Sequence, residues 1–131
     1  MRTAILTTLL GILSGSALAA RVAIHDDEST VVYVDPSTIR KSGDIVKMSQ
    51  LTDFTTARIP YGGERFRYSS SKAHNEYDCK EKRARVLSFT WYSNNMGKGK
   101  EVYSTSKPGK WEPVVPESII GYLWQFACGQ R

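Results

Sequence analysis

The chain contains two cysteines, Cys79 and Cys128, and a bond between them would decide much of what it can fold into. Two cysteines in an exported protein are typical of one disulfide, whereas cytosolic pairs more often bind metals or do catalysis. Here those alternatives lack partners, because His25 and His74 are the only histidines and no Cys-x-x-Cys motif exists. If the chain is exported, we therefore expect one structural disulfide, Cys79–Cys128. Closing a loop of about fifty residues would stabilise the fold by roughly 4 kcal/mol in the chain-entropy model.

The N-terminus has the three parts of a secretory signal peptide. A positive charge at Arg2 precedes a mostly apolar run over 4–13, and Ala-Leu-Ala at 17–19 has the small-x-small pattern that signal peptidase recognises. We expect a signal peptide over 1–19, cleavage after Ala19 and a single domain over 20–131. An apolar run of about ten residues is too short to span a bilayer, which takes about twenty. The mature chain has no longer run and no cysteine at the cleavage point, which predicts a periplasmic, secreted or cell-surface protein that is not a lipoprotein and has no transmembrane segment.

The rest of the chain is patterned mostly as β-strand and shows no repeat or dividing linker. Runs of β-branched and aromatic residues between turn residues are typical of strands. The clearest alternation lies at 82–93, where Leu87, Phe89 and Trp91 are expected to point to one side. A loop containing proline and glycine is expected at 55–64. On this basis we expect extended segments over residues 22–25, 30–34, 45–54, 65–79, 82–93 and 101–104.

The C-terminal segment changes its hydrophobic period from strand to helix. Apolar residues recur at i, i+3, i+4, i+7 and i+8, which predicts one buried face of a helix that ends at Gly129. Cys128 lies on that face, so its bond to Cys79 would hold the helix against the sheet. We therefore expect an α+β fold of about six antiparallel strands with a C-terminal helix tethered by one disulfide. The opposite side of the helix is apolar as well, which leaves open a covering loop, a second subunit or simple burial; its residues are Ile119, Tyr122 and Phe126.

Several short blocks occur together in an order that resembles one known family. Val-Tyr-Val-Asp-Pro at 32–36 is followed by Glu-Tyr-Asp-Cys at 76–79 and by Met-Gly-Lys-Gly at 96–99. A single tryptophan, Trp111, then precedes Pro113 and Pro116, and the terminal helix ends in Ala-Cys at 127–128. In order and spacing these blocks resemble the bacterial surface-adhesin protein E family, and the resemblance covers essentially the whole mature chain.

The resemblance implies a curved antiparallel sheet with a disulfide-tethered C-terminal helix, in a protein that can form a homodimer. It also implies an adhesin that binds a host extracellular-matrix protein or an anionic glycan. In the founding adhesin, binding is attributed to a basic and aromatic stretch just before the first cysteine. One departure is that this chain lacks the cysteine on which a lipid anchor would be built. The residues of this sequence that match the binding stretch in character and spacing are Arg65, Phe66, Arg67, Tyr68 and Lys72.

Charge points to anionic partners outside the cytoplasm. The formal net charge is +5, of which Arg2 in the signal contributes one. A basic balance favours anionic envelope polymers, sulfated glycans or acidic proteins, although an ordinary soluble basic surface fits equally well. No nucleic-acid-binding motif accompanies the charge, so we expect no nucleic-acid partner. The cations form two groups interleaved with tyrosine and tryptophan, namely Arg58, Arg65, Arg67 and Lys72, and then Lys98, Lys100, Lys107 and Lys110.

Two clusters of chemically active residues are better explained without catalysis. The acidic run after His25 could bind a metal, but at a turn it more often is a solvated acidic loop. His74, Glu76 and Asp78 alternate on one face of a strand and could pair as acid and base, yet no nucleophile or oxyanion motif accompanies them. Gly97 and Gly99 lack the context of a phosphate-binding loop. We expect no catalytic residues, no metal and no cofactor.

The sequence therefore favours a non-catalytic binding protein of the cell envelope, similar to surface adhesins, that uses basic and aromatic loops. A second hypothesis is a periplasmic inhibitor or assembly accessory that acts on an envelope enzyme or complex. Both fit a small, exported, disulfide-bonded domain. An envelope enzyme is the least favoured interpretation, because no catalytic constellation is present.

Overall fold

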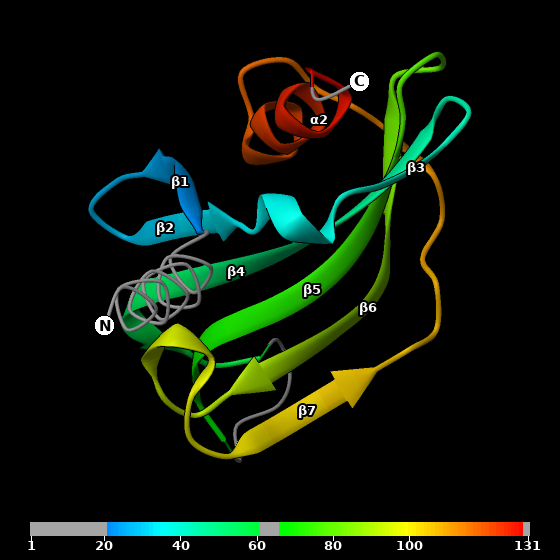
Figure 1. Ribbon diagram of the computed structural model, residues 1–131. Helices are drawn as coiled ribbons and strands as arrows, with labels where there is room; N and C mark the ends of the chain where they lie inside the picture. The colour runs from blue at the N-terminus through cyan, green and yellow to red at the C-terminus, as the bar shows by residue number, and fades with distance from the viewer. Residues whose placement is uncertain (1–20, 61–65, 130–131) are drawn as a thin grey trace, which may run out of the picture.

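The computed structural model describes residues 21–60 and 66–129. The predicted signal peptide and Arg65 lie outside the described residues. The described part is one antiparallel sheet with a single α-helix at the C-terminal end (Figure 1). This confirms the α+β fold predicted from the sequence.

Eight strands make up the sheet. Six of them follow one path in the order β1-β2-β4-β5-β6-β7, while β3 pairs with β4 and β8 pairs with β6. The two short strands β3 and β8 extend the number expected from sequence. The strands are β1 (Val22–Asp26), β2 (Thr30–Val34), β3 (Arg40–Ser42), β4 (Ile45–Arg58), β5 (Tyr68–Asp78), β6 (Arg83–Tyr92), β7 (Glu101–Thr105) and β8 (Glu112–Pro113).

Strand β4 is longer than predicted. The loop expected from Thr55 begins only after Arg58, because the chain stays extended and pairs Arg58 with Tyr68 of β5 beyond an irregularity in register. The backbone N–H of Thr55 donates to the carbonyl of Ser29 at 3.0 Å, and its hydroxyl donates to the carbonyl of Glu28 at 2.7 Å. These two bonds fasten β4 to the turn between β1 and β2.

A β-bulge in β6 decides which side chains share a face. His74 pairs with Ser88 and Asn75 pairs with Val86, so Leu87 has no partner in β5. An extra residue of this kind reverses the alternation on one side of the bulge. Phe89 and Trp91 are confirmed as neighbours on one face, but Leu87 falls at the bulge and does not simply continue their row.

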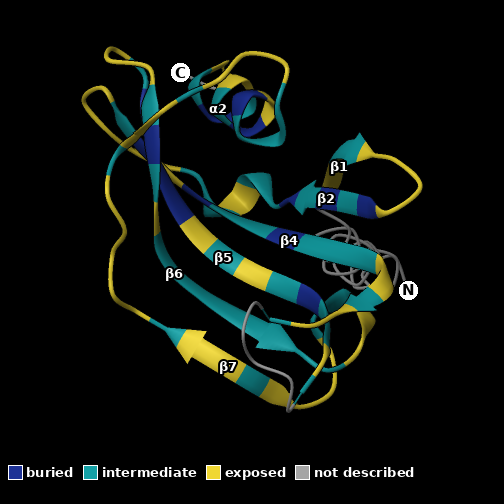
Figure 2. Cartoon of the chain, turned by 180° about the vertical axis from the view of Figure 1, so that it is seen from behind, coloured by how far each residue is buried: buried dark blue, intermediate teal, exposed yellow. Residues whose placement is uncertain are grey.

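The core lies between α2 (Ile119–Gly129) and one face of the sheet. We call this the helix face and the opposite side the open face. In Figure 1, α2 lies on the inner side of the bend that β4, β5 and β6 make. Leu123 and Ala127 of α2 are fully buried, and Figure 2 shows buried segments on the strands below the helix. The strand residues of this core are Val32, Val34, Val46, Met48, Tyr77 and Ala84.

The second apolar side of α2 is mostly accounted for by this core. Ile119 and Phe126 are partly buried and pack against the core cluster. Tyr122 remains 37% exposed, and its ring stacks on His25 of β1 with 6.1 Å between ring centroids. The sequence left three explanations open for this side of the helix. Simple burial, one of them, accounts for Ile119 and Phe126 but not for Tyr122.

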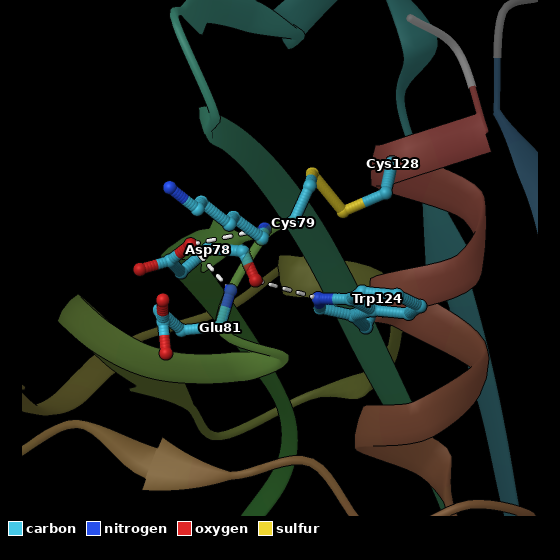
Figure 3. Close-up of a disulfide and its surroundings, with 6 residues drawn as sticks. Asp78, Cys79, Glu81, Trp124 and Cys128 are labelled. Atoms are coloured by element: carbon cyan, nitrogen blue, oxygen red, sulfur yellow. Dashed lines mark hydrogen bonds between the residues drawn. A yellow bond between two sulfur atoms is a disulfide. The ribbon is translucent and has the colours of Figure 1, made fainter.

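Two links hold α2 to the end of β5 (Figure 3). Cys79, in the turn after β5, is bonded to Cys128 with 5.7 Å between their Cα atoms, within the ordinary range for a disulfide. The indole N–H of Trp124 donates to the backbone carbonyl of Asp78 at 3.0 Å. The backbone N–H of Cys79 in turn donates to the carbonyl of Asp44 at 2.8 Å. The predicted tether between helix and sheet is confirmed.

Replacing both Cys79 and Cys128 with serine should lower the free energy of unfolding by about 4 kcal/mol, because the bond closes a loop with a sequence separation of 49. Urea denaturation of the wild type and of the double variant measures the difference. The unsubstituted protein with a reductant should match the variant. Equal midpoints for the oxidised and reduced protein would contradict a stabilising role.

Candidate binding surface

Six aromatic side chains form one connected group on the helix face. Tyr68 stacks on Trp91 with ring centroids 4.3 Å apart and planes 6° from parallel. Trp91 also contacts Tyr103 at 5.0 Å and Phe89 at 5.4 Å, while Phe54 meets the ring of Tyr68 edge-on at 5.7 Å. These contacts link β4, β5, β6 and β7. The aromatic cluster consists of Phe54, Phe66, Tyr68, Phe89, Trp91 and Tyr103.

Strand register explains how the cluster assembles. Trp91 pairs with Ser71 of β5 on one side and with Tyr103 of β7 on the other. Ser71 in turn pairs with Thr52, which shares its side of β4 with Met48 of the core, because side chains alternate along a strand. The cluster and the core therefore lie on the same face, at opposite ends of the sheet. Figure 1 shows α2 far from β7, and Tyr103 is 45% exposed.

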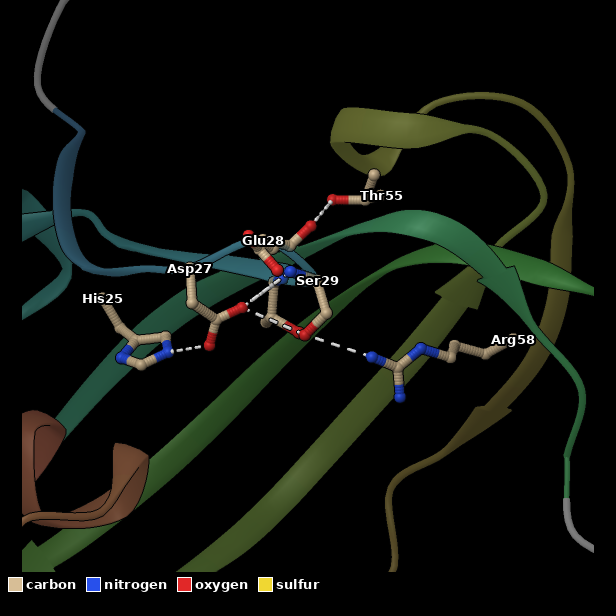
Figure 4. A network of polar contacts seen from close by, with 7 residues as sticks. His25, Asp27, Glu28, Ser29, Thr55 and Arg58 are labelled. Atoms are coloured by element: carbon tan, nitrogen blue, oxygen red, sulfur yellow. Dashed lines mark hydrogen bonds and ion pairs between the residues drawn. The ribbon is translucent and has the colours of Figure 1, made fainter.

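Arginines lie beside the cluster. The Arg58 guanidinium is 4.4 Å from the centroid of the Phe54 ring, and it reaches the hydroxyl of Thr30 at 3.4 Å (Figure 4). Arg67 is exposed immediately before Tyr68. A guanidinium over an aromatic ring keeps its charge available while its planar surface is packed. The edge of the cluster is therefore basic.

The structure brings together only part of the binding stretch taken from the family resemblance. Phe66 and Tyr68 belong to the aromatic cluster, and Arg67 is an exposed residue between them in sequence. Lys72 lies on the open face, where its ammonium is 5.4 Å from the centroid of the Tyr92 ring. Arg65 lies outside the described residues. Sequence reasoning missed Phe54, Phe89 and Trp91 as partners, because only the pairing of β4, β5 and β6 makes them neighbours.

The second basic group surrounds β7. Lys98 and Lys100 precede this strand, Lys107 and Lys110 follow it, and all four are exposed. Trp111, which the sequence placed among them, instead lies against two arginines of β6. Those guanidinium groups, of Arg83 and Arg85, are 4.5 and 4.7 Å from the centroid of the indole ring.

Ion pairs across β5 and β6 hold these two arginines in place. Arg83 bonds Asp78 at 3.0 Å and Arg85 bonds Glu76 at 2.6 Å. Trp111 therefore covers a paired, largely structural network. Alternating Asp/Glu and Arg on either side of a tight turn was the sequence signal that could have revealed it.

The side chain of His74 is hydrogen-bonded on the open face of the sheet. Its ring nitrogen Nδ1 lies 2.6 Å from the hydroxyl of Ser49, while the nearby carboxylates of Glu76 and Asp78 are bonded to arginines. Within the described ranges, no three His, Cys, Asp or Glu side chains are grouped to hold a metal ion.

The acidic run after His25 forms a turn held by local hydrogen bonds (Figure 4). His25 Nε2 lies 2.6 Å from a carboxylate oxygen of Asp27. The other oxygen of Asp27 accepts from the backbone N–H groups of Ser29 and Thr30. These bonds, led by that from His25, hold the pKa of Asp27 well below its usual value. The turn has a structural explanation without a bound ion.

Asp78 connects β5 to the tether. Its carboxylate accepts from the backbone N–H groups of Glu81 and Lys80 at 3.0 and 3.1 Å, as well as from Arg83. The bond from Glu81 is the largest cause that lowers the pKa of Asp78, and the other two add to it. A carboxyl whose pKa is lowered by folding stabilises the protein above its unfolded pKa of about 4, and this contribution is lost as pH falls.

Asp78→Asn should lower the thermal unfolding temperature at neutral pH. It should also reduce the loss of stability between about pH 5 and pH 2, because the variant has no ionised form to lose. Thermal unfolding at a series of pH values measures both effects. Glu28→Gln, at an exposed turn, is the matched control and should leave the curve unchanged. An acid limb as steep in Asp78→Asn as in the wild type would contradict the role of Asp78.

The described residues hold a tethered helix at one end of the sheet and a partly buried aromatic cluster, with Tyr103 exposed, at the other. No helix among them is long and apolar enough to cross a membrane.

Comparison with known proteins identifies the family. The sequence profile of the family described as surface-adhesin protein E matches residues 21–129, so the chain belongs to that family. Comparison with curated protein sequences gives no significant match.

Solved structures of Haemophilus influenzae protein E have the same fold. Crystal form II of that protein superposes with a TM-score of 0.66 at 13% identity, covering 86% of this chain and 89% of the other. Another structure of it gives 0.64 at 13% identity, covering 86% of each chain. Protein E from non-typeable Haemophilus influenzae gives 0.62 at 13% identity, with coverage of 85% and 76%.

Proposed function

We propose that this chain is an exported, non-catalytic adhesin that binds a host extracellular-matrix protein or a sulfated glycan through the aromatic cluster and its arginines. Membership of the surface-adhesin protein E family supports a surface adhesin. The observation that carries the finer proposal is the continuous contact from Phe54 through Tyr68 and Trp91 to the exposed ring of Tyr103.

Aromatic rings and arginines are suited to such ligands for complementary reasons. Tyrosine and tryptophan offer rigid surface at low entropic cost and are enriched among residues that dominate binding energy, as is arginine. Arginine donates two parallel hydrogen bonds to a sulfate or carboxylate, which adds orientation to attraction. The Tyr68–Trp91 stack supplies the rigid surface, and Arg58 supplies a cation over the Phe54 ring. Arg67 is an exposed cation next to Tyr68 in sequence.

The location of the protein in the cell tests whether it can act as an adhesin. An adhesin has to be displayed or released, so the protein should appear in the outer-membrane or medium fraction, with processing after Ala19 visible in the mass of the mature chain. A chain recovered only from the periplasm, bound stoichiometrically to an envelope enzyme, would instead favour the inhibitor or accessory hypothesis.

The variants Arg67→Ala and Tyr103→Ala should each weaken binding to immobilised heparin by roughly tenfold at low salt, the size of effect expected at a central contact residue. Binding should also fall with added salt, because screening weakens attraction between exposed charges. Surface plasmon resonance on a heparin surface and on a matrix-protein surface measures both effects. Lys47→Ala, at an exposed lysine of β4 on the open face, is the control.

No binding by the unsubstituted protein to either surface at low salt would refute the proposal. An equal loss in Lys47→Ala would show only general charge attraction. Thermal unfolding of each variant checks that the fold is retained.

A further inference from the structure

A separate pocket lies on the open face, away from the aromatic cluster. It has a volume of about 190 Å³ and is lined by residues of β2, β4 and β5 together with the turn after β2. Two cross-strand rows form its floor, because Leu51 pairs with both Tyr33 and Lys72, and Ser49 pairs with His74. These residues alternate with the core residues of the same strands and therefore point away from α2.

The rim of the pocket is fixed by the turn between β2 and β3. The hydroxyl of Thr38 donates to the carbonyl of Asp35 at 2.7 Å and accepts from the backbone N–H of Ser49 at 3.0 Å. The carboxylate of Asp35 is itself bonded to the backbone and hydroxyl of Ser37, at 3.0 and 2.6 Å. These bonds from neutral donors orient the one acidic side chain of the lining toward its own turn, and its carboxylate keeps its negative charge.

The Ser49–His74 pair always leaves a hydrogen-bond donor for a ligand. The hydroxyl of Ser49 and Nδ1 of His74 are 2.6 Å apart, and a single hydrogen lies between them. If Ser49 donates it, the remaining hydrogen of a neutral ring is on Nε2 of His74; if His74 donates it, the hydroxyl of Ser49 keeps its own hydrogen. Among the described residues, no other partner takes up that donor.

Two cations of the lining are not paired with a carboxylate in the described part of the chain. Arg21 and Lys72 both line the pocket, and neither forms an ion pair with a carboxylate of the described residues. Gly97 leaves room for the stem of Lys72, because a β-carbon there would come within 2.4 Å of Cε of the lysine. The pocket therefore presents positive charge and hydrogen-bond donors on exposed side chains of neighbouring strands.

We propose that this pocket binds an acidic monosaccharide unit through its carboxylate. Arg21 and Lys72 attract and hold the carboxylate, since charge-assisted hydrogen bonds of this kind are the strong ones. The Ser49–His74 pair donates to a ring hydroxyl, and Tyr33 with Leu51 supplies the apolar wall on which the sugar ring rests. A pocket of this size exceeds a bare oxyanion and suits a single sugar ring.

This site does not depend on the proposed function. The pocket is on the opposite face of the sheet from Trp91 and Tyr103, so substitutions of those rings leave the pocket intact. Failure of heparin binding and failure of sugar binding are therefore separate results.

Titration of the isotopically labelled chain, purified from the periplasm of an expression host, tests the proposal by NMR. Glucuronate should cause saturable shifts of the Ser49 and His74 backbone amides. Glucose and inorganic phosphate should bind at least about tenfold more weakly, since glucose lacks the carboxylate and phosphate lacks the sugar ring. Lys72→Gln and Arg21→Gln should each weaken glucuronate binding by about tenfold. Lys47→Gln removes the same charge outside the pocket, and Tyr103→Ala lies on the other face, so both should bind as the wild type does.

Three results would overturn the proposal. They are no saturable shift with glucuronate, equal affinity for glucose or for phosphate, and an equal loss of affinity in Lys47→Gln. Ser49→Ala gives a second reading, because it removes the hydroxyl without changing charge and should weaken glucuronate binding while phosphate binding stays the same.

Discussion

The attachment of α2 to the end of β5 is the constraint on which the rest of the structure depends. An open sheet with a solvent-exposed face on each side cannot bury enough apolar surface by itself. Leu123 and Ala127 cover the strand core, and the Cys79–Cys128 bond together with the Trp124 hydrogen bond fixes where that cover lies. Because the helix is held at one end, the other end of the same face remains available for the aromatic cluster.

The two candidate sites lie on different faces because side chains alternate along β5. Ser71 pairs with Trp91 on the helix face, while Lys72, the next residue, points to the open face. Residues that are adjacent in sequence therefore lie on different faces of the sheet. The bulge at Leu87 completes this arrangement, since it brings Phe89 and Trp91 onto the side that Ala84 and Asn75 share with the core.

Much of the fold could be predicted from the sequence, because its signals are local. The helical spacing of apolar residues predicted α2, and runs of β-branched residues predicted most strands. The two cysteines predicted the disulfide between helix and sheet. The length of β4 could not be predicted, since Arg58 stays in the strand through a partner, Tyr68, beyond the connecting segment. The candidate sites were harder to predict for the same reason, because they depend on contacts between residues far apart in sequence. Lys72 and Arg67 are close in sequence, which suggested that they share one surface. Strand register and the pocket beside the turn at Asp35 place Lys72 on the open face, away from the aromatic cluster.

The lysines around β7 have a consequence for how copies of the chain meet. Among the described strands, β7 pairs only with β6, so its outer edge is free to pair with a strand of another molecule. Antiparallel pairing of two β7 edges would set Lys98 and Lys100 of one copy against Lys107 and Lys110 of the other, at both ends of a five-residue strand. Repulsion between those like charges opposes such edge-to-edge pairing beside the aromatic cluster.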